Sequence, residues 1–229
     1  MTSPDLTVIV PALNEERTIR EVVERLLALP LATEIIVVND GSTDKTASIL
    51  EEYSSKLTIV TNEKPSGKGA AIVKALPKAT GRIVAIQDAD LEYAPEELVR
   101  LAQPILDKQT RVVFGNRFHQ GLPKEMAIPN KIVNILLAAT VRVLFGVKLH
   151  DEATCYKLVE TDLMREMNLQ CTRFEFCPEV TAKAIRLGAN ITELPISYVP
   201  RTKADGKKIR WTDAPDAFLT LFKYRFWKS

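Results

Sequence analysis

Apolar segments of strand length alternate with segments of helical periodicity in the first half of this 229-residue chain. Strands are expected at 6–10, 34–38, 57–61, 83–86 and 111–115, with helical patterns between them. Strands that alternate with helices build a mostly parallel, doubly wound sheet with helices on both faces. The sequence therefore predicts an α/β fold, and its 46% apolar and 26% charged residues are ordinary values for such a domain.

Three carboxylates follow the expected strand 83–86 at alternate positions: Asp88, Asp90 and Glu92. In an extended backbone alternate side chains share one face, so all three would point to one place. Like charges repel one another there, and a divalent cation with hard oxygen ligands removes that repulsion. The pattern predicts a metal site, although a polar strand end that leads into a helix at Pro95 gives the same pattern.

Polar residues also follow other expected strands: Asn14 and Glu15 after the first, Asp40 after the second and Arg117 after the fifth. Asn14 is in addition a plausible cap of the next helix. Ligands of doubly wound sheets bind at the carboxyl ends of the strands, so we expect one site there. The first turn lacks the glycines of a dinucleotide-binding fold, and 67–69 lacks the spacing of a Walker motif. A diphosphate would therefore be held through a metal on carboxylates.

The second half departs from this alternation. Apolar residues recur at helical spacing over 132–147, which predicts either a surface helix packed on the sheet or a helix lying in a lipid headgroup layer. We expect an edge strand at 191–199, a mobile loop at 201–208 over the site, and a basic, aromatic helix at 211–227. The segment 200–229 holds eight basic and three acidic residues, although the net charge of the chain is only +2.

The cysteines, the N-terminal segment and the net charge indicate in which cell compartment the chain would work. Cys155, Cys171 and Cys177 are odd in number and lack zinc-like spacing, which favours reduced thiols in a cytosolic protein. No signal peptide is expected, and the apolar stretch 132–147 is shorter than the ~20 residues of a membrane span. The small net charge gives no reason to expect nucleic acid as a partner.

Eight segments carry a family resemblance, in this order along the chain: 10–15, 37–46, 67–71, 88–92, 115–117, 151–157, 174–176 and 191–201. Together they resemble the family 2 inverting glycosyltransferases, in the branch of dolichyl-phosphate mannose synthase and the bacterial polyprenyl-phosphate sugar transferases. The resemblance implies a GT-A-type nucleotide-sugar-binding fold over 1–199, with a donor half at about 1–117 and an acceptor half at about 118–199. Residues 200–229 would form a basic loop and an amphipathic C-terminal helix.

The resemblance also implies roles for individual residues. Asp88, Asp90 and Arg117 would be catalytic, and the metal, Mg²⁺ or Mn²⁺, would be bound by Asp88, Asp90 and Glu92. The donor would be bound by Pro11, Asn14, Glu15, Asp40, Gly41, Ser42, Lys68, Asp88, Ala89 and Asp90. The acceptor and its phosphate would be bound by Arg117, Lys131, Asp151, Arg201, Lys207 and Lys208. Leu13 stands where relatives often have tyrosine, which leaves both uracil and guanine open as the base.

The implied reaction moves a sugar from GDP-mannose or a UDP-hexose to a polyprenyl or dolichyl phosphate with inversion of the anomeric centre. The protein would then work in the cytoplasm, bound peripherally to the cytoplasmic face of an anionic membrane, with room for a membrane-protein partner. One alternative is a glycosyltransferase with a soluble or polysaccharide acceptor. Another is a nucleotide-sugar-binding protein without turnover, which we would expect to lack part of the carboxylate set.

Overall fold

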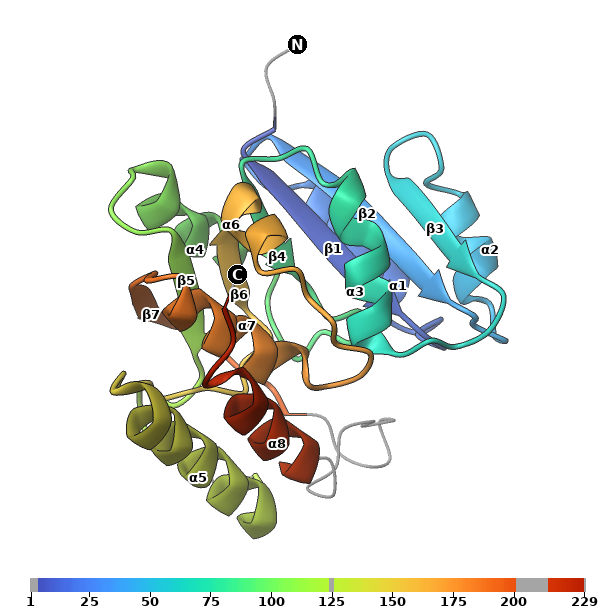
Figure 1. Ribbon diagram of the computed structural model, residues 1–229. Coiled ribbons are helices and arrows are strands. Elements are labelled where there is room, and N and C mark those ends of the chain that lie inside the picture. Colours follow the sequence, from blue (N-terminus) through green and yellow to red (C-terminus); the bar gives the residue numbers. More distant parts are fainter. Residues whose placement is uncertain (1–3, 124–125, 201–213, 229) are drawn as a thin grey trace.

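A computed structural model describes residues 4–123, 126–200 and 214–228, and the description below covers these residues (Figure 1). Their strands form one seven-stranded sheet in the order β3-β2-β1-β4-β6-β5-β7. The strands are β1 (Leu6–Ala12), β2 (Thr33–Asp40), β3 (Thr58–Asn62), β4 (Ile83–Ile86), β5 (Val112–Asn116), β6 (Lys157–Glu160) and β7 (Ile191–Pro195). All neighbours pair in parallel except β6, which runs antiparallel to both β4 and β5. The predicted mostly parallel sheet is confirmed.

Helices cover both faces of the sheet, as predicted. One face packs on α1 (Ile19–Leu27), α2 (Thr46–Glu51) and α4 (Glu97–Leu106). The other packs on α3 (Lys68–Ala75), the short 3₁₀ helix η1 (Leu76–Lys78), α6 (Thr161–Glu166) and α7 (Phe176–Arg186). The helices α5 (Ile128–Phe145) and α8 (Ala214–Tyr224) lie side by side beyond α7, at the end of the molecule away from the N-terminus (Figure 1).

The strand β6 was not predicted, because a lysine opens it and hides its apolar pattern. Lys157 is fully buried, and its ammonium donates to the carbonyl of Glu152 (2.7 Å) and the hydroxyl of Thr181 (3.0 Å). It also lies over the ring of Phe114, 3.5 Å from the centroid. These partners satisfy a charge that a sequence pattern assigns to the surface.

Several element boundaries differ from the prediction. Asn14 does not cap α1, which begins at Ile19; Asn14 has φ 52°, and its side-chain oxygen accepts from the amide of Thr43 (2.8 Å). The edge strand β7 ends at Pro195 instead of 199. The helix expected at 132–147 begins at Ile128 instead, because Pro129 suits a first helical turn, and it ends before Gly146.

The helix α5 does not lie on the sheet, so that alternative for the 132–147 segment is wrong. It packs on α7 and α8, and Leu137 and Val141 are its buried residues. Large apolar side chains on its other side are exposed to solvent: Ile128, Ile132, Ile135, Leu136 and Val143. By length and composition alone, this one helix among the described residues is long and apolar enough to cross a membrane. The stretch predicted at 132–147 is shorter, because the helical residues before Ile132 were not expected.

Candidate functional site

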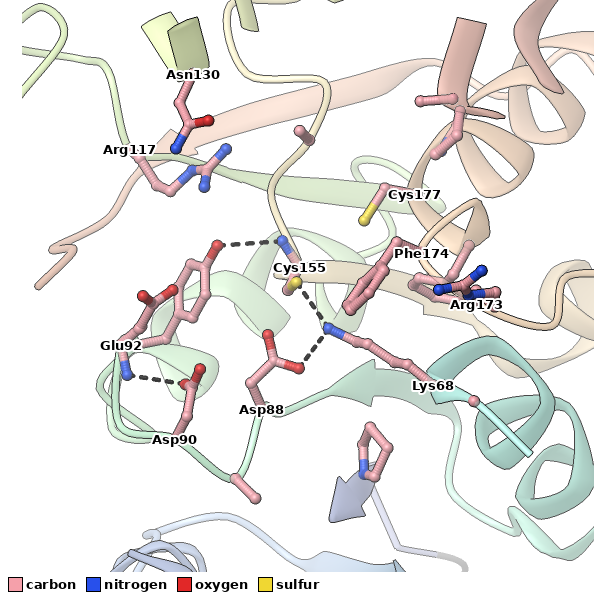
Figure 2. A pocket seen from close by; sticks show the side chains of 18 of the residues that line it. Lys68, Asp88, Asp90, Glu92, Arg117, Asn130, Cys155, Arg173, Phe174 and Cys177 are labelled. Atoms are coloured by element: carbon pink, nitrogen blue, oxygen red, sulfur yellow. Dashed lines mark hydrogen bonds and ion pairs between the residues drawn. The ribbon is translucent and has the colours of Figure 1, made fainter. Parts of the chain in front are cut away.

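A cavity of about 500 Å³ opens at the carboxyl ends of β1, β2, β4 and β5, where the doubly wound topology places ligand sites. Its wall combines residues of the loops after these strands with residues of α5, α7, α8 and the segment before β6. Both halves of the chain therefore contribute to one cavity. Figure 2 shows the carboxylates on one side and Arg117 with Asn130 on another.

The carboxylate loop turns directly after β4 instead of continuing as an extended strand. Asp90 accepts a hydrogen bond from the amide of Glu92 (3.0 Å), and Leu91 between them has φ 61°. Alternate side chains therefore do not share one face, and the period-2 argument for their convergence is wrong. Asp88, Asp90 and Glu92 all still line the cavity. Within the described residues, no three acidic, His or Cys side chains are gathered closely enough to hold a metal ion by themselves.

Lys68 crosses the cavity floor and forms an ion pair with Asp88 (Figure 2). Its ammonium also lies 2.9 Å from the sulfur of Cys155. Burial lowers the pKa of Lys68, but the neighbouring Asp88 and Cys155 outweigh burial and raise it well above its ordinary value. Lys68 is therefore a fixed positive charge beside the carboxylates.

The glycines on either side of Lys68 let another backbone come close. The amides of Gly69 and Ala70 donate to the carbonyls of Arg173 and Thr172, both at 3.0 Å. A Cβ at Gly67, which has φ +100°, would collide with the Thr172 carbonyl. The start of α3 is thus joined to the loop before α7, and its first amides are bonded to protein carbonyls.

Asp40 fixes the turn before α3 through hydrogen bonds. Its carboxylate, 3% exposed, accepts hydrogen bonds from the side chain of Asn62 (2.7 Å), the amide and hydroxyl of Ser66 (2.9 and 2.7 Å) and the amide of Gly67 (2.9 Å). Burial opposes the charge, but these donors hold the pKa of Asp40 below its usual value. Asp40 lines the cavity and fixes the turn that carries Lys68.

Arg117 is locked against Asp151. Its Nε and Nη2 donate to the two oxygens of this fully buried carboxylate at 2.7 and 2.6 Å, and its amide donates to the same group at 2.9 Å. Burial opposes the charge, yet Asp151 raises the pKa of Arg117 well above its usual value. Asn134 of α5 accepts a further bond from Nη2 (3.3 Å). The guanidinium is therefore held rigidly at the cavity wall as a cation.

An aromatic cluster connects Arg117 with the carboxylate loop. The guanidinium lies 5.1 Å from the centre of the Tyr198 ring, and the hydroxyl of Tyr198 donates to Glu92 (3.4 Å). The Tyr198 ring packs on Tyr93, and the amide of Val199 donates to the carbonyl of Glu92 (3.0 Å). The segment after β7 thus braces the two sides of the cavity.

The residues predicted for the site fall into three groups. Those that line the cavity are Pro11, Glu15, Asp40, Lys68, Asp88, Ala89, Asp90, Glu92 and Arg117. Those that do not are Asn14, Gly41, Ser42, Lys131 and Asp151. Asn14 and Ser42 bond the ends of β1 and β2 together, since the amide of Asn14 donates to the hydroxyl of Ser42 (3.0 Å). Arg201, Lys207 and Lys208 lie outside the described residues.

Several residues of the cavity wall have no role predicted from the sequence, among them Tyr93, Asn130, Cys155 and Cys177. Tyr93 follows the carboxylates by one residue, so its position in the same loop was a usable signal. Asn130 belongs to the first turn of α5, which was expected to begin later. The two cysteines are 22 residues apart in the sequence, and hydrogen bonds from Lys157 to Thr181 and from Cys177 to Thr154 connect α7 with the segment that holds Cys155.

The donor set fits a hard divalent cation. Carboxylate oxygens of Asp88, Asp90 and Glu92 are ligands that Mg²⁺ and Mn²⁺ prefer. Magnesium is commonly held by one or two carboxylates together with substrate phosphates and water, so a ready-made cage of three protein ligands is not required.

Comparison with known proteins identifies the family. The model of glycosyl transferase family 2 matches residues 7–167. A UDP-N-acetylglucosamine–dolichyl-phosphate N-acetylglucosaminyltransferase of Methanococcus voltae is 29% identical over 214 residues, 83% of this chain and 84% of that protein. A low-salt glycan biosynthesis hexosyltransferase of Haloferax volcanii is 30% identical over 204 residues, 87% of this chain and 49% of that protein. The chain thus spans only about half of the Haloferax relative.

Two further proteins extend the comparison. Dodecaprenyl-phosphate galacturonate synthase of Rhizobium johnstonii is 28% identical over 87% of this chain and 60% of its own. The crystal structure of glucosyl-3-phosphoglycerate synthase from Mycobacterium tuberculosis with UDP has a TM-score of 0.74 at 22% identity, and covers 97% of this chain and 80% of that one. The same synthase was also crystallised with Mn²⁺, UDP and phosphoglyceric acid. This likeness shows that the fold is of the predicted GT-A type. The chain therefore belongs to glycosyltransferase family 2, together with relatives that are polyprenyl-phosphate sugar transferases.

Proposed function

We propose that this protein transfers a sugar from a nucleotide diphosphate-sugar to a polyprenyl phosphate, with Mg²⁺ or Mn²⁺ and with inversion. The observation that carries the proposal is one cavity with two opposed charge sets. Three carboxylates lie on the donor side, and a locked arginine lies on the acceptor side. Family membership and the relatives named for dolichyl and dodecaprenyl phosphate support the same reaction.

The donor binds on the side of β1, β2 and β4 in this proposal. Asp90 and Asp88 would hold the metal, with Glu92 as a helper, and the metal would neutralise charge on the leaving diphosphate. Lys68 adds a second positive charge, held in place by Asp88 and by the turn on Asp40. Pro11, Glu15 and Ala89 line the space that the nucleotide would occupy. Both uracil and guanine remain candidates for the base.

The acceptor phosphate binds at Arg117. A phosphate monoester is already anionic near neutral pH, so it needs position and charge screening more than a general base. Asp151 occupies Nε and one hydrogen of Nη2, Asn134 accepts from Nη2 as well, and the two hydrogens of Nη1 are the donors for phosphate. Asp151 therefore serves as the positioning residue of Arg117, and in-line attack from this side inverts the anomeric centre.

The lipid chain leaves the cavity along α5 in this proposal. Asn130, Val133 and Asn134 of this helix line the cavity, while Ile132 and Ile135 are 52% and 56% exposed. A helix with one face on the cavity and the other face apolar and exposed suits the plane of a membrane surface better than a transmembrane position. On α8, Leu219, Phe222 and the following Phe226 are also exposed. We infer peripheral binding to an anionic leaflet through these two helices.

A reaction panel tests the proposal. The protein is incubated with GDP-mannose, UDP-glucose or UDP-N-acetylglucosamine, with either undecaprenyl phosphate or 3-phosphoglycerate, and products are identified by mass. We expect a glycosylated lipid with one donor, loss of product in EDTA, and recovery with Mg²⁺ or Mn²⁺. Product on 3-phosphoglycerate alone would favour the soluble-acceptor alternative. Donor binding without any product would favour the binding protein without turnover.

A further inference from the structure

The side chains of Cys155 and Cys177 face the same cavity. The proposed reaction assigns no role to either thiol. Cys155 lies in the segment before β6, and Cys177 lies in the first turn of α7. The sulfur of Cys177 donates to the carbonyl of Thr154, the residue before Cys155, which places the two side chains in the same part of the cavity wall. Figure 2 shows both sulfur atoms on the cavity wall, with Lys68 bonded to Cys155.

The surroundings distinguish this pair from the third cysteine. Cys155 is partly exposed to the cavity, and Cys177, 8% exposed, donates from its sulfur to the carbonyl of Thr154 (3.4 Å). Cys171 is 3% exposed, is not part of the cavity wall and packs in the core beside α7. A small solute that enters the cavity therefore meets the side chains of Cys155 and Cys177 and does not meet that of Cys171.

We propose that Cys155 and Cys177 are a reversible oxidation site, which a small peroxide converts to a disulfide. With hydrogen peroxide, the sulfur of Cys155 takes one oxygen, the O–O bond breaks, and a sulfenic acid and one water form. The sulfur of Cys177 then attacks the Cys155 sulfur, the S–O bond breaks, and a second water carries away the thiol proton. The two sulfur atoms together lose two electrons to the peroxide. A dithiol reverses the change by disulfide exchange.

Oxidation would alter the donor side through Lys68. The ammonium now has Asp88 and the Cys155 sulfur as partners, and a disulfide sulfur tied to α7 cannot accept that bond in the same geometry. Lys68 then relies on Asp88 alone, which draws this carboxylate away from a metal. The consequence for sugar transfer rests on the proposed function, whereas the formation of the disulfide does not.

The first experiment locates the chemistry. The full chain is exposed to hydrogen peroxide, remaining thiols are alkylated, and peptides are mapped by mass. We expect a Cys155–Cys177 linkage with loss of two hydrogens, removal of the linkage by dithiothreitol, and alkylated Cys171. Cys155→Ser and Cys177→Ser should each abolish the linkage, and Cys171→Ser is the matched control that should keep it. Full alkylation of Cys155 and Cys177 after peroxide treatment of the folded protein would overturn the proposal.

The second experiment measures the consequence. Binding of UDP and of GDP, each with Mn²⁺, is measured by calorimetry before oxidation, after oxidation and after reduction. We expect the Kd of the preferred nucleotide to rise at least tenfold on oxidation and to recover on reduction, and Cys177→Ser to show no such change. A complete disulfide with unchanged affinity and turnover would overturn the link to Lys68. If the reduced protein bound neither nucleotide, the proposed function would fail, and the peptide map alone would decide the oxidation site.

Discussion

Arg117 and Asp151 illustrate how a residue's role depends on its partner. The sequence analysis placed both on the acceptor side, and the fold makes one the support of the other, because both oxygens of the buried carboxylate are taken up by Arg117. A guanidinium held in this way keeps its orientation when a phosphate arrives. The pair is therefore a structural element of the core and a charged group of the cavity at once.

Replacement of Arg117 by lysine keeps the charge and removes the bidentate grip. We expect a loss of stability of about 1–3 kcal/mol, because Asp151 stays buried with fewer donors. Transfer should fall through a higher KM for the acceptor phosphate, while donor affinity stays within about twofold. Calorimetric melting, donor titration and acceptor kinetics provide the three readouts. Arg111→Lys is the matched control, since Arg111 makes an exposed pair with Glu160, and its effect on stability should stay below about 1 kcal/mol. Collapse of donor affinity in Arg117→Lys would contradict the assignment of Arg117 to the acceptor side.

Asp90→Asn tests the metal ligand without a change of volume. We expect at least a ~10³-fold fall in kcat with a native melting temperature, because the metal's charge stabilisation contributes several kcal/mol to the barrier. Excess Mn²⁺ should not restore the rate. Turnover near that of the wild type in a folded Asp90→Asn protein would exclude this residue as the principal ligand.

Among the elements, those with regular periodicity could be predicted and those shaped by distant contacts could not. Strands β1 to β5 are short apolar runs between helical patterns, so their positions along the chain, and with them the sheet edge that carries the site, followed from the sequence. The strand β6 was missed because Lys157 is satisfied by Glu152 and Thr181, which no local pattern reveals. Arg117 was predicted from its position after a strand and Lys68 through the family resemblance, whereas Cys177 reaches the cavity through the packing of α7.

The contact between α3 and the loop before α7 supports a prediction at this scale. Gly67 and Gly188 both have positive φ, but a Cβ at Gly67 meets the Thr172 carbonyl and a Cβ at Gly188 meets nothing within 4 Å. Alanine should therefore cost about 1–3 kcal/mol more at Gly67 than at Gly188, since only the first substitution overpacks the structure. Urea unfolding of the two variants gives the difference. Equal costs would mean that the α3 contact adapts freely.

At the scale of the whole molecule, charge and apolar surface coincide at one end. The exposed apolar side chains of α5 and α8 lie on neighbouring helices, and Lys223 and Lys228 are exposed on or directly after α8. Tyr224 and Leu221 are buried in the core, so the aromatic residues of the C-terminal segment divide between core and surface. The C-terminal segment is therefore neither wholly exposed to a membrane nor wholly buried in the core.

Liposome flotation tests membrane docking by this end. Binding should rise with anionic lipid and fall in high salt, because each cation near an anionic leaflet contributes ~1 kcal/mol within a Debye length. Replacement of Lys223, Arg225 and Lys228 by glutamine should weaken it, and Ile132→Ser with Ile135→Ser should weaken it even at low salt. Replacement of the remote, exposed Lys56, Lys78 and Lys108 by glutamine is the charge-matched control. Equal flotation of all variants on neutral and anionic vesicles would rule out electrostatic docking.

The antiparallel insertion of β6 limits how this chain can be recombined with its relatives. A chimera could join residues 1–117 to the second half of a relative, since the predicted donor half ends there. In the sheet, however, β4 would then pair with a β6 strand supplied by the relative. The foreign β6 would have to match the side chains of both β4 and β5, and the foreign loop before α7 would have to match α3. To test the proposed acceptor side, α5 and α8 are the better segments to exchange, because neither helix interrupts a strand of the sheet.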